Sequence, residues 1–362
     1  MAERADVLVV GAGVAGLGAA AMLSGEASVI VLEAESAPCF HSTGRSAAIF
    51  IKSYGPPGVR AATLASEPFY EAPPEGFAEA PLLLPRGLLF VDPVGGALDA
   101  LVTETPGMVF IDPADALRFC PALRPDRIVA ASYEEDARDI DVDLLTGGFR
   151  RMMRAGRGHL VTGAEVKALS RSGGVWRADT VAGAFEAPIV VDAAGAWSSR
   201  VAALAGAAPI HVQPKRRSAA MVPGPAGEDV NRWPLVGDAA ETWYAAPKAG
   251  KLMVSPADAD PIEACDVWPD DMVLAEGLHR FSEAMTFEVA RVERTWAGLR
   301  SFSPDGEPVV GFDPAAEGFF WLAGQGGYGI QTAPALSHLA ADLVLGRDPS
   351  LDPRPFAPAR FA

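Results

Sequence analysis

Blocks of continuously apolar residues, separated by glycine and proline, are the main pattern along this chain. The clearest block opens it: apolar residues at 7–10, a glycine-containing run of small residues, and a second apolar run at 29–32 that ends at Glu33. Short apolar runs bounded by turn residues indicate buried strands. This order of segments predicts a strand, a glycine turn, a helix and a second strand, with Glu33 at the end of the second strand.

The same patterns divide the rest of the chain. Ser42 and Thr43, followed by small residues, suggest a helix start. Apolar spacing and capping residues predict further helices at 60–70, 139–155, about 270–285 and 334–345. Strand-like runs occupy 82–91, 187–192 and, between proline and glycine turns, much of 209–300.

The predicted fold class is α/β, or α+β overall, with a Rossmann-like domain and a second, mainly antiparallel-sheet domain. At 362 residues the chain is long enough for two domains. We expect a discontinuous nucleotide-binding domain at about 1–80, 140–205 and 300–362. The substrate domain is then expected at about 81–139 and 206–299.

Gly11, Gly13 and Gly16 have the spacing of a dinucleotide-binding turn. Glycines let the backbone turn tightly and approach a pyrophosphate, to which the helix N-terminus presents free N–H groups. Glu33 follows about 20 residues later, where a carboxylate binds a ribose hydroxyl and repels the 2′-phosphate of NADP. An ordinary βαβ unit without a ligand is the alternative.

The net charge and the cysteine content exclude several classes of partner and of site. A net charge of −16 makes nucleic acid and anionic membranes unsuitable partners. Cys39, Cys120 and Cys265 are far apart and form no C-x-x-C pair, so we expect neither disulfides nor a metal site. The sequence has no apolar stretch suited to spanning a bilayer, and we expect a reduced, cytoplasmic protein.

A second glycine-rich loop, 325–332, lies between the apolar run 318–324 and the last predicted helix. Such a turn aims several backbone N–H groups at one point and suits negative charge. In a flavoenzyme that charge would be on the N1–C2=O edge of the reduced ring. A plain strand-to-helix turn is the alternative.

These segments together resemble the D-amino acid oxidase superfamily of FAD enzymes. The resemblance rests on the first motif and on segments 41–48, 192–197, 295–306 and 324–332. Segments 42–48, 213–219 and 326–332 are most similar to bacterial D-arginine dehydrogenase-like, FAD-dependent D-amino acid dehydrogenases. The resemblance implies extended FAD with its flavin between the two domains. No cysteine follows Cys265 near the C-terminal loop, so we expect the FAD to be noncovalent.

The resemblance also assigns cofactor contacts to the residues that match these motifs. The implied FAD-binding residues are Gly11, Ala12, Gly13, Gly16, Glu33, Ser42, Thr43, Arg45, Ser46, Ala47, Ala48, Val166, Ala194, Gly195, Trp197, Gly327, Tyr328, Gly329, Ile330, Gln331 and Thr332.

A bound amino acid needs a fixed cation for its carboxylate, and an arginine fork can clamp both oxygens. Arg217 and Arg300 match family positions that face the flavin. A solvated basic cluster is the alternative for Arg217, and a structural ion pair is the alternative for Arg300. Arg216, next to Arg217 on the same predicted strand, should point to the opposite face.

Tyr54, Tyr244 and Gly327 complete the predicted catalytic set, although each tyrosine also suits a buried core position. The implied reaction transfers hydride from Cα of a D-amino acid to flavin N5. The imino acid product then hydrolyses to a 2-oxo acid and ammonia. No histidine or carboxylate is an obvious base in the sequence.

The strand at 86–90 departs from family members that prefer cationic side chains, because it carries no acid. Ile49, Ile51 and Leu235 add apolar surface near the predicted site. Burying an uncompensated cation there is unfavourable. We therefore expect apolar or small D-amino acids to be better substrates than D-arginine or D-lysine.

Three other functions fit the same FAD site. A glycine or sarcosine-type oxidase and a 2-hydroxy-acid dehydrogenase need the same carboxylate clamp. A noncatalytic flavin-binding partner protein is a third, which the presence of both Arg217 and Arg300 disfavours. The electron acceptor is left open between a quinone or other carrier and molecular oxygen.

Overall fold

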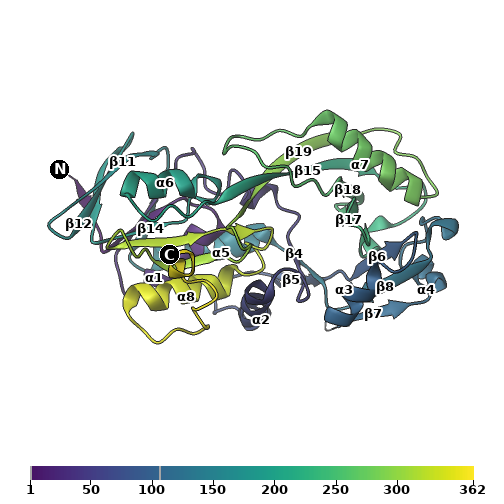
Figure 1. Ribbon diagram of the computed structural model, residues 1–362, viewed down its shortest axis with the longest axis horizontal. Helices are drawn as coiled ribbons and strands as arrows, with labels where there is room; N and C mark the ends of the chain where they lie inside the picture. The colour runs from purple at the N-terminus through teal and green to yellow at the C-terminus, as the bar shows by residue number, and fades with distance from the viewer. Residues whose placement is uncertain (1, 106) are drawn as a thin grey trace.

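The computed structural model describes residues 2–105 and 107–362 and has two lobes along its longest axis (Figure 1). One lobe contains both ends of the chain and a six-stranded sheet, and the other contains most of a nine-stranded sheet. Met1 and Pro106, which fall within the expected domain ranges, lie outside the described residues.

The six-stranded sheet confirms the predicted Rossmann-like half of the fold. Its order is β10-β3-β2-β14-β21-β20, and all neighbours are parallel except β20 and β21. The strands are β2 (Val7–Val10), β3 (Val29–Leu32), β10 (Gly158–Val161), β14 (Ile189–Asp192), β20 (Val309–Phe312) and β21 (Phe319–Ala323).

Alternate residues of β2 serve the two faces of this sheet, as strand geometry requires. Val7 and Val9 pack against three helices, whereas Leu8 and Val10 pack against a small sheet and one helix. The three helices are α1 (Val14–Leu23), α5 (Val142–Ala155) and α8 (Ala333–Leu345). The opposite face is covered by α6 (Ser198–Ala205) and by β1 (Glu3–Arg4), β11 (Val166–Ser172), β12 (Val175–Thr180) and β13 (Gly183–Ala187).

The nine-stranded sheet confirms the predicted second, mainly antiparallel half. Its order is β22-β19-β15-β18-β17-β16-β6-β8-β7, and only β6 and β16 are parallel neighbours. The strands are β6 (Leu88–Asp92), β7 (Met108–Ile111), β8 (Ala130–Glu134), β15 (Gln213–Pro223), β16 (Leu235–Asp238), β17 (Tyr244–Lys248), β18 (Lys251–Ser255), β19 (Arg294–Phe302) and β22 (Gln325–Gly326).

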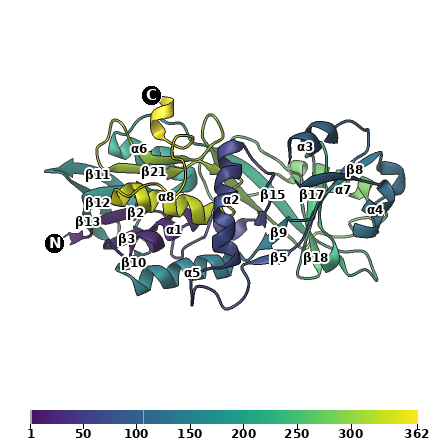
Figure 2. The ribbon, with the colours of Figure 1, turned by 90° about the horizontal axis from the view of Figure 1, so that it is seen from below.

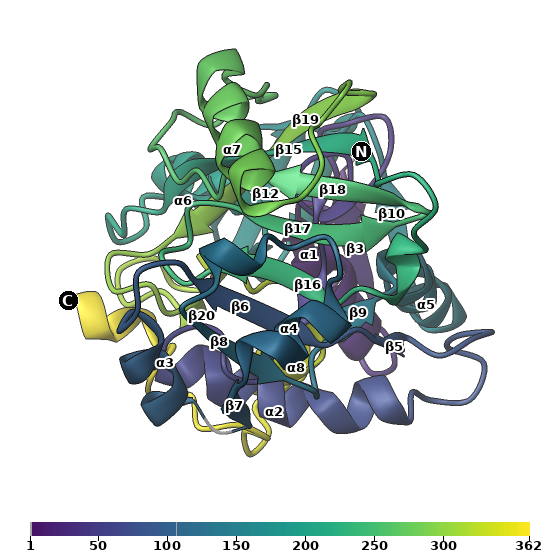
Figure 3. The same ribbon diagram turned by 90° about the vertical axis from the view of Figure 1, so that its right-hand side faces the viewer.

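One face of this sheet packs on helices and the other faces a cavity. The covered face buries residues of α4 (Pro113–Phe119) and α7 (Asp271–Ala284), which lie over the strands in Figure 3. The short helix α3 (Leu98–Glu104) lies near β7 and β8.

A separate three-stranded sheet has the order β4 (Ile49–Phe50), β9 (Arg138–Ile140) and β5 (Leu83–Pro85). Helix α2 (Pro57–Glu71) lies where the two lobes meet (Figure 2).

Most predicted elements are present, but the helix expected to start at Ser42 and Thr43 is wrong. The chain forms only a short 3-10 helix there, because Ser46 is already extended and the backbone then enters β4. The helix expected over 139–155 starts at Val142, where Asp141 accepts the Leu144 N–H at 2.9 Å. The 3-10 helices are η1 (Thr43–Arg45), η2 (Pro125–Arg127), η3 (Gly195–Trp197), η4 (Val230–Arg232) and η5 (Pro358–Phe361).

The glycine turn between β2 and α1 depends on close backbone contacts. Gly11 has a φ of 100°, and a Cβ there would lie 2.5 Å from the Ala193 carbonyl oxygen. A Cβ on Gly16 would lie 1.9 Å from the Gly11 carbonyl oxygen. The helix can therefore approach β2 and β14 closely only with glycine at both positions.

Asp192, the last residue of β14, gives a testable pH dependence of stability. Burial raises the pKa of its carboxyl to about 7, although Oδ1 accepts the Ala194 N–H at 3.0 Å. Since an unfolded carboxyl titrates near about 4, the folded form is favoured at low pH and loses stability as pH rises through about 7. As the pH rises from about 4 to just above about 7, we expect the thermal midpoint of Asp192→Asn to fall less than that of the wild type. Circular dichroism measures both midpoints. Asp348→Asn, an exposed control, should follow the wild type. An equal fall in Asp192→Asn would contradict the argument.

Candidate active site

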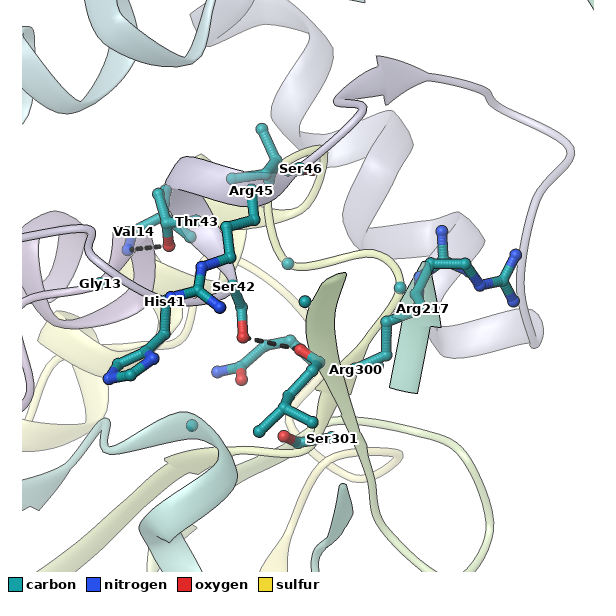
Figure 4. A pocket seen from close by; sticks show the side chains of 18 of the residues that line it. Gly13, Val14, His41, Ser42, Thr43, Arg45, Ser46, Arg217, Arg300 and Ser301 are labelled. Atoms are coloured by element: carbon teal, nitrogen blue, oxygen red, sulfur yellow. Dashed lines mark hydrogen bonds between the residues drawn. The ribbon is translucent and has the colours of Figure 1, made fainter. Parts of the chain in front are cut away.

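A cavity of about 710 Å³ lies where the two sheets meet, and residues from both line it. It extends from the glycine turn at Gly11 and Glu33 to Arg217 on β15 and Arg300 on β19. Gly13 and the arginines lie toward opposite sides of the view in Figure 4. Its volume is within the range of ligand and cofactor sites.

At the glycine end, a carboxylate and a helix N-terminus are held side by side. Glu33 Oε2 accepts the Ala12 N–H at 2.7 Å, and Glu33 Oε1 accepts the Glu35 N–H at 2.9 Å. Thr43 Oγ1 accepts the Val14 N–H at 3.1 Å. The first turn of α1 has no acidic residue of its own, so no side chain of the helix itself compensates its positive dipole end. This end suits a phosphate next to a ribose hydroxyl.

The segment at η1 lines the cavity and is tied to β19. Ser42 Oγ donates to the Leu299 carbonyl oxygen at 2.6 Å (Figure 4). The Arg45 guanidinium donates to the Ala297 carbonyl oxygen at 3.1 Å and pairs with Asp266 at 2.5 Å. The side chain of Arg45 therefore fixes this segment, whose residues Ser42, Thr43 and Ser46 also line the cavity.

The C-terminal glycine-rich loop is braced in a similar way. Gln331 Oε1 accepts the Ile51 N–H at 3.2 Å, and its Nε2 donates to Thr63 Oγ1 at 2.9 Å. A Cβ on Gly327 would lie 3.1 Å from Arg300 Nη1. Glycine at position 327 therefore lets this loop lie directly against the arginine.

The two candidate arginines project from the same face of an antiparallel strand pair. Arg217 is opposite Gly298, and Lys215 is opposite Arg300, so Arg217 and Arg300 are diagonal neighbours. Both are half-buried and both line the cavity. Within the described residues neither forms an ion pair, and the buried Nε of Arg217 has no hydrogen-bond partner.

Arg216 points to the opposite face, as predicted. Its guanidinium lies 3.3 Å from Asp258 and 3.0 Å from Asp260. The neighbouring basic residue is therefore neutralised by acids, whereas Arg217 is not. An arginine pair without acids, half removed from water, favours an anionic ligand.

Aromatic hydroxyls surround the arginine pair. The Tyr244 ring lies 5.9 Å from Arg217 Cζ, and the Tyr54 ring packs edge-on against Tyr328 at 4.9 Å. Burial alone would raise the pKa of Tyr244, but the charges of Arg300 and Arg217 outweigh it and lower the pKa below its ordinary value. Burial raises the pKa of Tyr328 to about 12, so this phenol stays protonated.

Most of the residues singled out from the sequence lie on the cavity wall. Four of them do not line it: Ala12, Gly16, Tyr328 and Thr332. The others do: Gly11, Gly13, Glu33, Ser42, Thr43, Arg45, Ser46, Ala47, Ala48, Tyr54, Val166, Ala194, Gly195, Trp197, Arg217, Tyr244, Arg300, Gly327, Gly329, Ile330 and Gln331.

Several wall residues were not singled out from the sequence. Ser53 and Glu241 line the cavity, and Glu241 is an acid on the turn between β16 and β17. His41 also lines it and lies 2.9 Å from Glu35. His41 lies in segment 41–48 and Ser53 lies next to Tyr54, so both were close to sequence signals, whereas the position of Glu241 on the wall depends on folding.

The cavity as a whole fits an extended dinucleotide. It joins a glycine turn, the Glu33 carboxylate and the N-terminus of α1 to a cationic end. A family model described as FAD dependent oxidoreductase, DAO, matches residues 6–343. This chain belongs to the DAO family of FAD-dependent oxidoreductases. FAD is its cofactor, and the superfamily predicted from the motifs is confirmed.

This member of the DAO family is similar in sequence to several known proteins. It is 32% identical to glycine oxidase of Geobacillus kaustophilus over 190 residues, which cover 50% of this chain and 47% of that protein. It is 29% identical to FAD-dependent oxidoreductase domain-containing protein 1 of Bos taurus over 193 residues, covering 49% of this chain and 40% of that one. The matches thus span about half or less of these relatives.

Solved structures share the whole fold. The crystal structure of glycine oxidase from Geobacillus kaustophilus has a TM-score of 0.86 at 23% identity and covers 98% of both chains. That of L-proline dehydrogenase from P. horikoshii has a TM-score of 0.83 at 21% identity, covering 100% of this chain and 98% of the other. Glycine oxidase is thus among the relatives of this chain, and the finer likeness to D-arginine dehydrogenase stays a prediction. Among the described residues, no helix has the length and apolarity needed to cross a membrane.

Glu33 provides a test of the proposed adenosine end. Replacing Glu33 by alanine removes one hydrogen bond from the Ala12 N–H of the glycine turn and one from the Glu35 N–H, together with the acceptor for a ribose hydroxyl. Since hydrogen bonds to a charged group contribute roughly 1.5–3 kcal/mol each, we expect FAD to bind about tenfold more weakly or worse. Titration of the apoprotein with FAD, followed by flavin fluorescence, measures this. Glu26→Ala, at an exposed position after α1, is the control. Equal affinity in Glu33→Ala would show that the carboxylate does not contact FAD.

Proposed function

We propose that this FAD-dependent oxidoreductase oxidises D-amino acids with apolar or small side chains to imino acids. The imino acid then hydrolyses to a 2-oxo acid and ammonia. The observation that carries the proposal is the pair Arg217 and Arg300, which has no acidic partner in the described residues and faces an apolar wall of the same cavity.

Arg217 and Arg300 suit the carboxylate of an amino acid. Each guanidinium offers several N–H donors and stays protonated at any relevant pH. Tyr54 and Tyr244 add phenol donors beside them. Holding the carboxylate at fixed points also fixes which hydrogen on Cα faces the cofactor, so binding contributes to rate and stereochemistry.

The wall near the arginines is predominantly apolar. Leu88, Met108, Leu235 and Met253 project from the cavity face of the nine-stranded sheet. Other apolar wall residues are Ile49, Ile51, Phe90 and Leu101. These apolar groups favour a hydrocarbon side chain in contact with them, because a cation packed directly against them would lose hydration.

Bound FAD supplies the acceptor for the hydride that leaves Cα. The protein's part is to bind the substrate, orient Cα and exclude water. We propose noncovalent FAD held by the cavity residues named above. Burial raises the pKa of Cys39, the cysteine on the cavity wall, to about 11, so its thiol stays protonated and is a poor nucleophile.

A glycine oxidase activity is the second candidate, favoured by the likeness to glycine oxidase of Geobacillus kaustophilus. Glycine needs the same clamp for its carboxylate but leaves the apolar wall without a partner. The relative rates with glycine and with larger D-amino acids therefore distinguish the two.

A substrate panel tests the proposal. Mixing the holoenzyme anaerobically with D- and L-amino acids, glycine, sarcosine and 2-hydroxy acids should bleach the flavin absorbance fastest with an apolar D-amino acid. Admitting oxygen afterwards identifies the class of acceptor. Highest kcat/KM with D-arginine would contradict the predicted side-chain preference. Fastest reduction by glycine would favour the second candidate, and no reduction by any amino acid would refute the proposed reaction.

Arginine variants test the clamp. In Arg217→Met and Arg300→Met we expect kcat/KM to fall by about a hundredfold or more, because truncating one partner of a buried charge pair costs roughly 2–5 kcal/mol. The loss should fall mainly on KM and should be smaller for an amino acid amide, which lacks the carboxylate. Arg294→Met is a matched control, since Arg294 is exposed at the start of β19. Equal losses in the control would assign the effect to the strand rather than the clamp.

A further inference from the structure

A buried carboxylate lies behind the apolar wall. Glu134, the last residue of β8, is 1% exposed. It is the register partner of Leu88 on β6 and of Met108 on β7. Cross-strand partners project from the same face of a sheet. Because Leu88 and Met108 both line the cavity, Glu134 also projects toward it.

Ser53 connects this carboxylate to the cavity. Ser53 lies on the loop between β4 and α2, lines the cavity and donates its hydroxyl hydrogen to Glu134 Oε2 at 2.5 Å. Within the described residues, Glu134 Oε1 has no hydrogen-bond partner. A serine hydroxyl that donates to a carboxylate keeps its own lone pairs for another donor. Ser53 can therefore present a hydrogen-bond acceptor to the cavity.

The charges around Glu134 leave it without a dedicated cation. Lys52, on the same loop, pairs with Glu67 at 2.9 Å and with Asp136 at 3.3 Å. The flanking strands contribute apolar Leu88 and Met108. Burial raises the pKa of Glu134 above its ordinary value, and the repulsion from Asp136 adds to this, whereas Ser53 and Lys52 oppose it.

This acid matches a chemical need of the proposed reaction. A free amino acid carries an ammonium group, whose nitrogen must lose a proton before hydride can leave Cα and an imine can form. Arg217 and Arg300 can only donate hydrogen bonds. The ammonium needs an acceptor, and Ser53 backed by Glu134 is one that lies on the cavity wall.

We propose that Glu134, acting through Ser53, accepts the proton that the substrate ammonium loses before oxidation. This inference rests on the proposed amino acid oxidation. An ammonium N–H bond breaks and its proton moves to Ser53 Oγ, while the Ser53 hydroxyl proton moves to Glu134 Oε2. The products are a neutral amine and a neutral carboxyl group, and no electron changes hands. Ser53 contacts the substrate, and Glu134 sets the proton affinity of Ser53.

The test is the pH dependence of anaerobic flavin reduction by D-leucine in the wild-type holoenzyme, Glu134→Gln and Ser53→Ala. Glutamine keeps the volume and the oxygen acceptor for Ser53 but cannot take a proton. In both variants we expect the rate near neutral pH to fall by about a hundredfold, the scale of a lost general base. The rate should then rise with pH until the free substrate amine forms, whereas the wild type reaches its plateau at lower pH.

Controls separate the possible outcomes. Glu135→Gln changes the neighbouring, exposed acid and should keep the wild-type profile. A wild-type profile in Glu134→Gln, with loss only in Glu134→Ala, would assign Glu134 a packing role and overturn the proposal. If the wild type is reduced by no amino acid, the proposed function fails and this inference fails with it. If the wild type is reduced and the profiles of all variants coincide, only this inference fails.

Discussion

Two guanidinium groups without acidic partners, half-buried on one face of the β15–β19 pair, are the constraint on which the site depends. Removing such charges from water is costly unless another group compensates them. The register places Arg217 beside Arg300, and the alternation of the strand sends Arg216 to acids on the other face. The protein thus keeps one cationic pair for a ligand while neutralising its neighbour, which is the arrangement expected for binding an anion.

The loops that surround this pair come from distant parts of the chain and stabilise one another. Ser42 donates to the carbonyl oxygen of Leu299, next to Arg300, and Gln331 accepts from the Ile51 N–H. Glu307 accepts the first N–H groups of α2 and so fixes the end of the loop that carries Tyr54. A change in any one of these contacts would therefore disturb both the cofactor cradle and the arginine end.

Local sequence signals predicted the glycine turn, the alternating sheet and the long helices, because each depends on neighbouring residues. They also separated Arg216 from Arg217, since strand alternation is local. The predicted helix start at Ser42 was wrong, because Ser46 is already extended and leads into strand β4. Glu134 could not be found at all: its role depends on the pairing of β8 with β6 and β7, which the sequence does not specify. The domain boundaries stay a prediction.

Hydrogen-bond donors lie at one part of the cavity and an acceptor at another. An amino acid can therefore bind in one orientation. The carboxylate is expected at the arginines, where the substrate carboxylate and the guanidinium groups both stay charged after binding. The ammonium is expected near Ser53, where the proposed proton transfer converts a cation and a buried anion into two neutral groups. In a poorly hydrated site this conversion removes the cost of keeping the Glu134 carboxylate ionised. The same burial that makes Glu134 unfavourable as a structural acid therefore makes it effective as a proton acceptor.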